Sequence, residues 1–114
     1  MHGRKMFYNQ LAIALNLPDL DFVIAGDVML ITLAKSIYIS IHTAIQRDED
    51  TVYITNIDIS IKSIPNGNLI ESLQIVPEQR INVSLNDLIY NEIADVIYQI
   101  SALKRFYKHM IETQ

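Results

Sequence analysis

Isoleucine alternates with polar residues through most of residues 36–64, and this pattern constrains the fold more than any other feature of the chain. Ile37, Ile39 and Ile41 share one side of an extended chain, whereas the intervening side chains are mainly polar. Strict alternation of this kind predicts a half-buried β-strand. Residues 46–50 (QRDED) carry too much charge to be buried and predict a connecting loop. The alternation then resumes, so the segment predicts two strands joined by a loop.

The alternation changes phase within the second of these strands. Val52 and Ile54 occupy even-numbered positions, whereas Ile57 and Ile59 occupy odd-numbered ones. A β-bulge adds one residue to one strand and so moves the side chains that follow to the opposite face. We therefore predict a bulge at Thr55-Asn56. Burial of both faces at one end of the strand is the alternative.

The N-terminal part of the chain predicts a helix over residues 5–17. Phe7, Leu11 and Leu15 recur at helical spacing and form one apolar face. Pro18 disfavours helical geometry in the residue before it and so predicts the end of the helix. Residues 1–4 precede the pattern and are predicted to form a loose tail.

Between this helix and the isoleucine-rich segment, the sequence predicts a short strand, a tight turn at Gly26-Asp27 and a second strand over residues 28–33. A continuous helix is the competing interpretation, but Gly26 and the β-branched residues disfavour it. Further along, residues 69–76 fit either a short strand or a helical turn, and residues 80–85 fit a last short strand.

The C-terminal part of the chain predicts a long amphipathic helix, which begins after a capping residue at Ser84 or Asn86. Acidic residues are concentrated near its start and basic residues near its end, an order that complements the helix dipole. Its apolar stripe consists of Ile89, Ile93, Val96, Ile97, Ile100, Leu103, Tyr107, Met110 and Ile111.

Together these elements predict an α+β fold. We expect an antiparallel sheet of four to five strands, flanked by an N-terminal helix and a long C-terminal amphipathic helix. A chain of 114 residues fits one domain, so residues 1–114 are assigned to a single domain.

The composition bears on the kind of partner. Charged residues make up 19% of the chain and hydrophobic residues 50%, so polar side chains are scarce for covering a surface. This indicates either an exposed apolar patch, and hence a partner or self-association, or an ordinary core rich in isoleucine. The net charge of −4 disfavours nucleic acid and anionic membranes as partners, and no apolar run is long enough for membrane insertion. The absence of cysteine suits the cytoplasm.

No group of residues predicts a catalytic or metal site. His42 has no companion ligands at a telling spacing, and residues 48–50 lack the alternation of a calcium loop. The sequence LKRFYKHM (103–110) mixes cations with aromatic residues, but on a helix these aromatics are expected to join the core. We therefore expect a protein that is not an enzyme and that binds no cofactor, metal or nucleic acid.

Three stretches resemble the small acidic chaperones of bacterial type III secretion that serve a single effector. They are MFYNQLAIALNLPDLDF (6–22), the hairpin around QRDED that ends at SIP (63–65), and VIYQISALKRFYKHM (96–110). The resemblance lies in the order of elements and the acidic balance. These chaperones usually carry a middle helix and further strands between the hairpin and the last helix, and the middle helix often forms the dimer interface. Here only residues 66–85 fill that place.

The resemblance implies a cytoplasmic chaperone or adaptor linked to virulence that holds an extended segment of a partner protein at a sheet edge and in apolar grooves. The residues implied to bind the partner are Phe7, Leu11, Leu15, Ile37, Ile39 and Ile41. Ordinary core packing of all six is the alternative. If they line a groove, replacing Phe7 and Leu11 by aspartate abolishes partner capture while the fold persists.

Two other hypotheses remain open from the sequence. The first is a small inhibitor or regulatory subunit, phage-encoded for example, that binds an enzyme or a small ligand. The second is a subunit that folds only within a homo- or hetero-oligomer.

Overall fold

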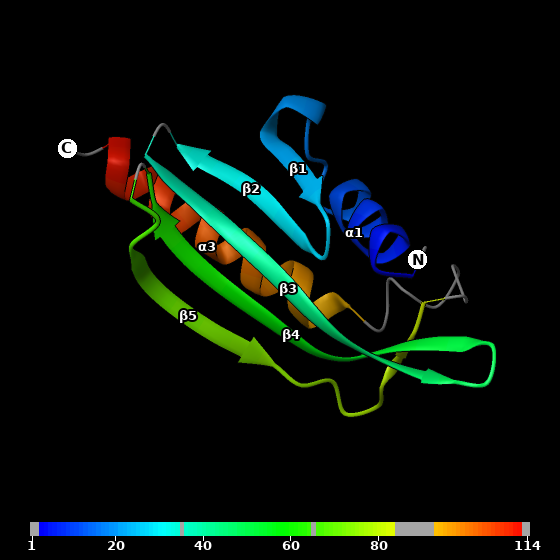
Figure 1. The fold of residues 1–114 in the computed structure, drawn as a ribbon. Coiled ribbons are helices and arrows are strands. Elements are labelled where there is room, and N and C mark those ends of the chain that lie inside the picture. The colour runs from blue at the N-terminus through cyan, green and yellow to red at the C-terminus, as the bar shows by residue number, and fades with distance from the viewer. Residues whose placement is uncertain (1–2, 35, 65, 84–92, 113–114) are drawn as a thin grey trace.

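A computed structural model describes residues 3–34, 36–64, 66–83 and 93–112 of the chain (Figure 1). In chain order the elements are α1 (Gly3–Ala14), the 3-10 helix η1 (Asp19–Asp21), β1 (Phe22–Ala25), β2 (Val28–Ala34), β3 (Ile37–Asp48), β4 (Thr51–Ser63), β5 (Leu69–Ile75), β6 (Ile81–Asn82) and α3 (Ala94–Glu112).

The strands form one antiparallel sheet in the order β1-β2-β3-β4-β5, and the two-residue β6 pairs with β4 beyond the end of β5. Each strand of the main path therefore pairs with its neighbour in sequence. The predicted α+β fold with two flanking helices is confirmed. The last short strand expected over residues 80–85 is β6, and the sheet has six strands where four to five were expected. Residues 69–75 are a strand, which decides between the two structures that the sequence allowed there.

The predicted bulge in β4 is also confirmed. Ala44 pairs with Asn56, and the next residue of β3, Ile45, pairs with Ile54. Thr55 is therefore the extra residue on β4. Because it absorbs one position, Ile54 on one side of the bulge and Ile57 on the other are both fully buried.

The predicted loop over residues 46–50 is wrong in extent. Pairing continues to Asp48 and Thr51, and only Glu49 and Asp50 form the turn. Charged residues are compatible with strands here because the tip of the hairpin is exposed. Arg80 also supports this end: its guanidinium lies 3.8 Å from the centre of the Tyr53 ring and 3.2 Å from Oδ2 of Asp48.

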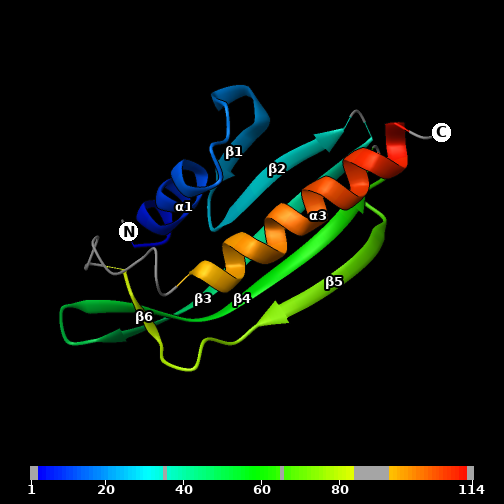
Figure 2. The same ribbon diagram turned by 180° about the vertical axis from the view of Figure 1, so that it is seen from behind.

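Both long helices lie against the same face of the sheet, which we call the inner face (Figure 2). Ile39, Ile41 and Ile59 project from this face into the core, while Ser40 and Asp58 lie on the opposite, outer face. The buried hydrophobic residues are Phe7, Tyr8, Leu11, Ala12, Leu17, Met29, Ile31, Ile37, Ile39, Ile41, Ile54, Ile57, Ile59, Ile61, Ile81, Val83, Ile93, Val96, Ile100 and Tyr107.

Helix α1 ends earlier than Pro18 predicts, because Asn16 ends it. Asn16 adopts a left-handed φ of 54°, its N–H donates to the carbonyl of Ile13, and the N–H of Leu17 donates to the carbonyl of Ala12. These two bonds form the Schellman arrangement that satisfies carbonyl groups at a helix end.

The helix also begins earlier than predicted. Gly3 and Arg4 are helical rather than part of a loose tail. A Cβ on Gly3 would lie 2.9 Å from Cγ1 of Val52, so any other residue here would force Val52 or the helix to shift.

Helix α3 has 19 residues, or about 28 Å of length. Val96, Ile100 and Tyr107 of the predicted stripe are buried against the sheet. The capping residues predicted at Ser84 or Asn86 lie outside the described residues.

We expect Gly26→Ala to lower the free energy of unfolding by about 1 kcal/mol, since Gly26 occupies the β1–β2 turn with a φ of 64°. A Cβ here would meet nothing within 4 Å, so the substitution isolates the cost of the backbone conformation. Urea denaturation monitored by circular dichroism measures the change. Unaltered stability would show that the turn does not require this conformation.

Candidate protein-binding surfaces

The residues predicted to bind a partner lie mainly in the core. Phe7, Leu11, Ile39 and Ile41 are fully buried, and Ile37 is 9% exposed. These residues do lie close together, but they do so in the core, where the helices pack on the inner face of the sheet. Core packing, the alternative kept open above, is therefore the interpretation that their burial supports. Leu15 differs: it is partly buried at the end of α1 and borders a groove beside α3.

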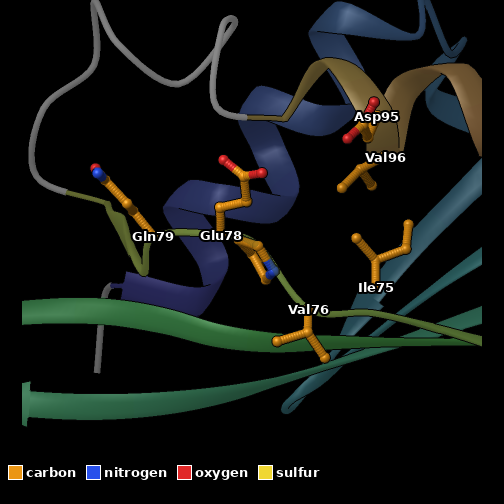
Figure 3. A pocket seen from close by; sticks show the side chains of 7 residues that line it. Ile75, Val76, Glu78, Gln79, Asp95 and Val96 are labelled. Carbon is orange, nitrogen blue, oxygen red and sulfur yellow. The ribbon is translucent and has the colours of Figure 1, made fainter.

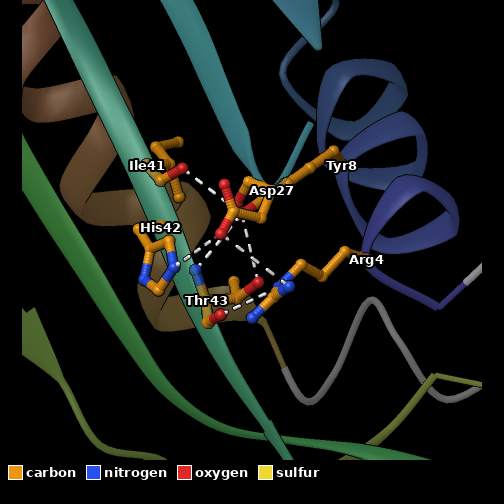
Figure 4. Close-up of polar contacts among 6 residues, drawn as sticks. All are labelled: Arg4, Tyr8, Asp27, Ile41, His42 and Thr43. Atoms are coloured by element: carbon orange, nitrogen blue, oxygen red, sulfur yellow. Dashed lines mark hydrogen bonds and ion pairs between the residues drawn. The ribbon is translucent and has the colours of Figure 1, made fainter. Parts of the chain in front are cut away.

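A polar cluster fixes α1 to the sheet (Figure 4). Strand β2 begins opposite His42, so β3 has no β2 partner at Thr43. The hydroxyl of Tyr8 takes that place. It accepts a hydrogen bond from the Thr43 N–H at 3.2 Å, donates to the Asp27 carbonyl at 2.7 Å, and lies 3.1 Å from Oγ1 of Thr43.

Charged groups surround the outer part of this cluster. Nε of Arg4 donates to the carbonyl of Thr43 at 3.0 Å, and the carboxylate of Asp27 lies 4.0 Å from Nη1 of Arg4 and 3.4 Å from Nε2 of His42. The two side chains of the Asp27–His42 pair are about half exposed, so the pair contributes little to stability.

The chemistry of the cluster is that of a structural contact. Burial raises the pKa of Tyr8 above its ordinary value of 10.0, more than its hydrogen bonds to Thr43 lower it. A general base at neutral pH requires a pKa shift in the opposite direction. The cluster therefore holds α1 in place, and Tyr8 links the helix to Asp27, directly before β2, and to Thr43 of β3.

The exposed apolar residues gather partly along β5, an edge strand of the sheet. Leu69 is 60% exposed and Ile70 is 47% exposed, and Val76 directly after the strand is 67% exposed. On one side β5 pairs with β4; on its other side, no strand of the described chain pairs with it. Among the described residues, the backbone groups on the outer side of this seven-residue strand therefore have no strand partner.

Helix α3 adds an apolar side chain beside this edge. The hydroxyl of Tyr107 donates to Oε1 of Glu71 at 3.1 Å, which places the C-terminal part of α3 next to β5. Phe106 contacts the Tyr107 ring and is 59% exposed. Asp95 lies eleven residues, or about three helical turns, before Phe106, so both side chains project from the same flank of α3. Asp95 lines a pocket together with residues at the end of β5. The exposed ring of Phe106 therefore lies on the flank of α3 that faces β5.

That pocket lies where β5 ends, between the following loop and the start of α3 (Figure 3). Its volume is about 350 Å³. Ile75, Val76 and Val96 provide apolar walls, and the carboxylates of Glu78 and Asp95 stand at its rim. The edge of β5 thus leads directly into a hollow that can receive a side chain.

Known proteins provide no further guide to the function. No family model, curated protein or solved structure matches the chain. Within the described ranges, no three His, Asp or Glu side chains are grouped so that they could hold a metal ion. No helix among the described residues is long and apolar enough to cross a membrane.

Strand β5 was not among the binding surfaces predicted from the sequence. A signal was present, because LIESLQI (69–75) contains neither lysine nor proline, the residues that commonly protect edge strands. Its position at the edge follows from strand order, which the sequence pattern alone does not specify.

Proposed function

We propose that the protein is a non-enzymatic chaperone or adaptor that holds an extended segment of a partner protein at the free edge of β5. The observation that carries this proposal is an edge strand with exposed apolar residues that, among the described residues, pairs with β4 alone. A peptide that pairs with such an edge gains main-chain hydrogen bonds, and its alternate side chains enter neighbouring pockets.

The two edges of the sheet differ in a way that favours β5. The edge strand β1 has only four residues, and short edge strands offer little pairing. Strand β5 has seven residues, and Leu69 and Ile70 at its start are exposed. Phe106 on one flank and the pocket at Val76 supply apolar contacts for a bound segment.

We further propose a cytoplasmic protein similar to the chaperones of type III secretion, with a secreted or regulatory protein as its partner. The acidic net charge and the order of terminal helices around an antiparallel sheet support this. In one respect the chain departs from that pattern: strands follow the hairpin, as in those chaperones, but the described residues 66–83 contain no helix.

The test compares two doubly substituted variants with the wild-type chain in pull-downs from native host cells, read by mass spectrometry. We expect Leu69→Lys with Ile70→Lys to reduce recovery of the specific partner by about tenfold or more, because it removes apolar contacts and places charge on the edge. The matched control is Ile13→Lys with Leu20→Lys, two exposed apolar residues outside β5. This control should retain the partner.

Hydrogen exchange on the purified complex gives the second measurement. Amides of β5 should become protected when the partner binds, and partial proteolysis should map the bound part of the partner to one extended segment. Equal retention of the partner by both variants would overturn the proposal. So would a dimer of this chain that forms through β5 and excludes the partner, as light scattering would show.

A further inference from the structure

A second groove lies on the other flank of α3, between this helix, the end of α1 and β2. Its volume is about 280 Å³. In Figure 2, β2 and β5 lie on opposite sides of α3, so the groove and the β5 edge are separated by the helix. Leu15, directly after α1, and Leu33 of β2 supply its apolar surface, and both side chains pack partly against the core. Ser101, Lys104, Arg105 and Lys108 line the groove from α3.

The cations converge because of their spacing along α3. Lys104 and Lys108 are four residues apart and Arg105 and Lys108 are three apart, the spacings at which side chains are neighbours on a helix, and all three line the groove. In the part of the chain that the structure describes, none of the three has an ion-pair partner. Among the described residues that line the groove, none carries a carboxylate. Among the described side chains, three cations with no ion-pair partner are therefore clustered on a protein whose net charge is −4.

We propose that this groove binds an acidic segment of the partner protein, one that carries leucine or phenylalanine between its Asp and Glu residues. The charges select the segment, and the leucines contact its apolar side chains. The inference rests on the proposed function in that the ligand is a protein, but it concerns a different surface and a different chemistry from the β5 edge.

The groove favours a protein segment over a nucleic acid for two reasons. Nucleic-acid affinity depends mainly on neutralising many phosphates, and the rest of this acidic chain opposes a long polyanion. In addition, Leu15 and Leu33 provide apolar contact area, which a sugar-phosphate backbone does not use. A helix is only about 10–12 Å across, so one partner chain can reach both the groove and the β5 edge.

The experiment selects peptides from a phage-displayed library of random dodecamers on the purified full chain. We expect enriched peptides to combine several Asp or Glu residues with Leu or Phe. Lys104→Glu with Lys108→Glu should weaken their binding by about tenfold or more, and raised salt should weaken binding to the wild type, because the attraction is between partly exposed charges.

The matched control is Lys5→Glu with Arg47→Glu, which changes the net charge equally at exposed positions outside the groove. This control should bind the selected peptides within about twofold of the wild type. Enrichment of peptides without acidic residues, or equal loss of binding in both variants, would overturn the proposal. A fluorescent dT12 oligonucleotide that binds more tightly than the selected peptides, and whose binding Lys104→Glu with Lys108→Glu abolishes, would also overturn it. The groove would then be a site for phosphate groups.

The proposals for the β5 edge and for the groove can be tested independently of each other. Leu69→Lys with Ile70→Lys should leave the acidic peptides bound, because these residues lie along β5 on the other side of α3. Loss of the acidic peptides in that variant would contradict the assignment to the groove. Loss of the native partner in that variant alone supports the β5 edge and does not depend on the acidic peptides.

Discussion

Replacing Phe7 and Leu11 together by aspartate is expected to abolish the folded state. Both side chains are fully buried between α1 and the sheet. Truncation of a buried Phe or Leu costs about 2–5 kcal/mol at each site. An ionised carboxylate in the same place adds a desolvation cost that no partner offsets. The sum is comparable with the whole stability of a typical domain, which is about 5–15 kcal/mol.

Circular dichroism and thermal unfolding measure this outcome. The double variant should show no cooperative transition, whereas Ile13→Asp on the same helix should stay within about 0.5 kcal/mol of the wild type, because Ile13 is 61% exposed. A double variant that keeps its circular dichroism and loses only a partner would restore the hypothesis of a groove at these residues.

Tyr8→Phe is expected to lower the free energy of unfolding by about 1–3 kcal/mol without changing the fold. The substitution removes one hydroxyl and leaves the N–H of Thr43 and the carbonyl of Asp27 without that partner. An unpaired buried polar group carries its full desolvation cost. Urea denaturation at neutral pH measures the loss. Thr43→Val is a useful comparison, because it removes only Oγ1 and keeps the N–H donor.

The same residue predicts a dependence on alkaline pH. The pKa of Tyr8 is raised in the folded state, so its stabilising contribution is complete below the unfolded value of about 10. It is lost as the pH rises from there through the folded pKa, since the unfolded chain releases this proton first. Tyr107 is shifted in the same direction by burial and by Glu71. Tyr8→Phe should therefore reduce, and not eliminate, the loss of stability above pH 10. Equal pH profiles for wild type and variant would contradict this role of Tyr8.

The sequence predicts the strands well where one face is buried. The alternation from Ile37 onward specifies both β3 and the position of the bulge at Thr55, because each side chain must face either the core or solvent. The prediction from alternation fails at the hairpin tip. The charged residues up to Asp48 are exposed there and still form a strand, so charge does not indicate a loop. The end of α1 was also misplaced, because the left-handed conformation of Asn16 depends on the bonds that close the helix.

The candidate binding surfaces were harder to predict than the fold. Apolar residues at regular spacing, such as Phe7 and Leu11, indicate that a face is buried, but not whether the chain itself or a partner covers it. The β5 edge and the groove at Lys104 depend on which strand lies at the edge and on which flank of α3 faces α1. Both are properties of the assembled molecule.

The order of the strands along the chain has a consequence for synthesis. Because each strand of the main path pairs with the one before it, the sheet can assemble as it emerges from the ribosome. Its isoleucine face, however, is covered largely by α3, which is translated after every strand. A stalled or truncated product that ends before Ala94 would therefore expose the apolar inner face of the sheet, and such exposed surface favours aggregation.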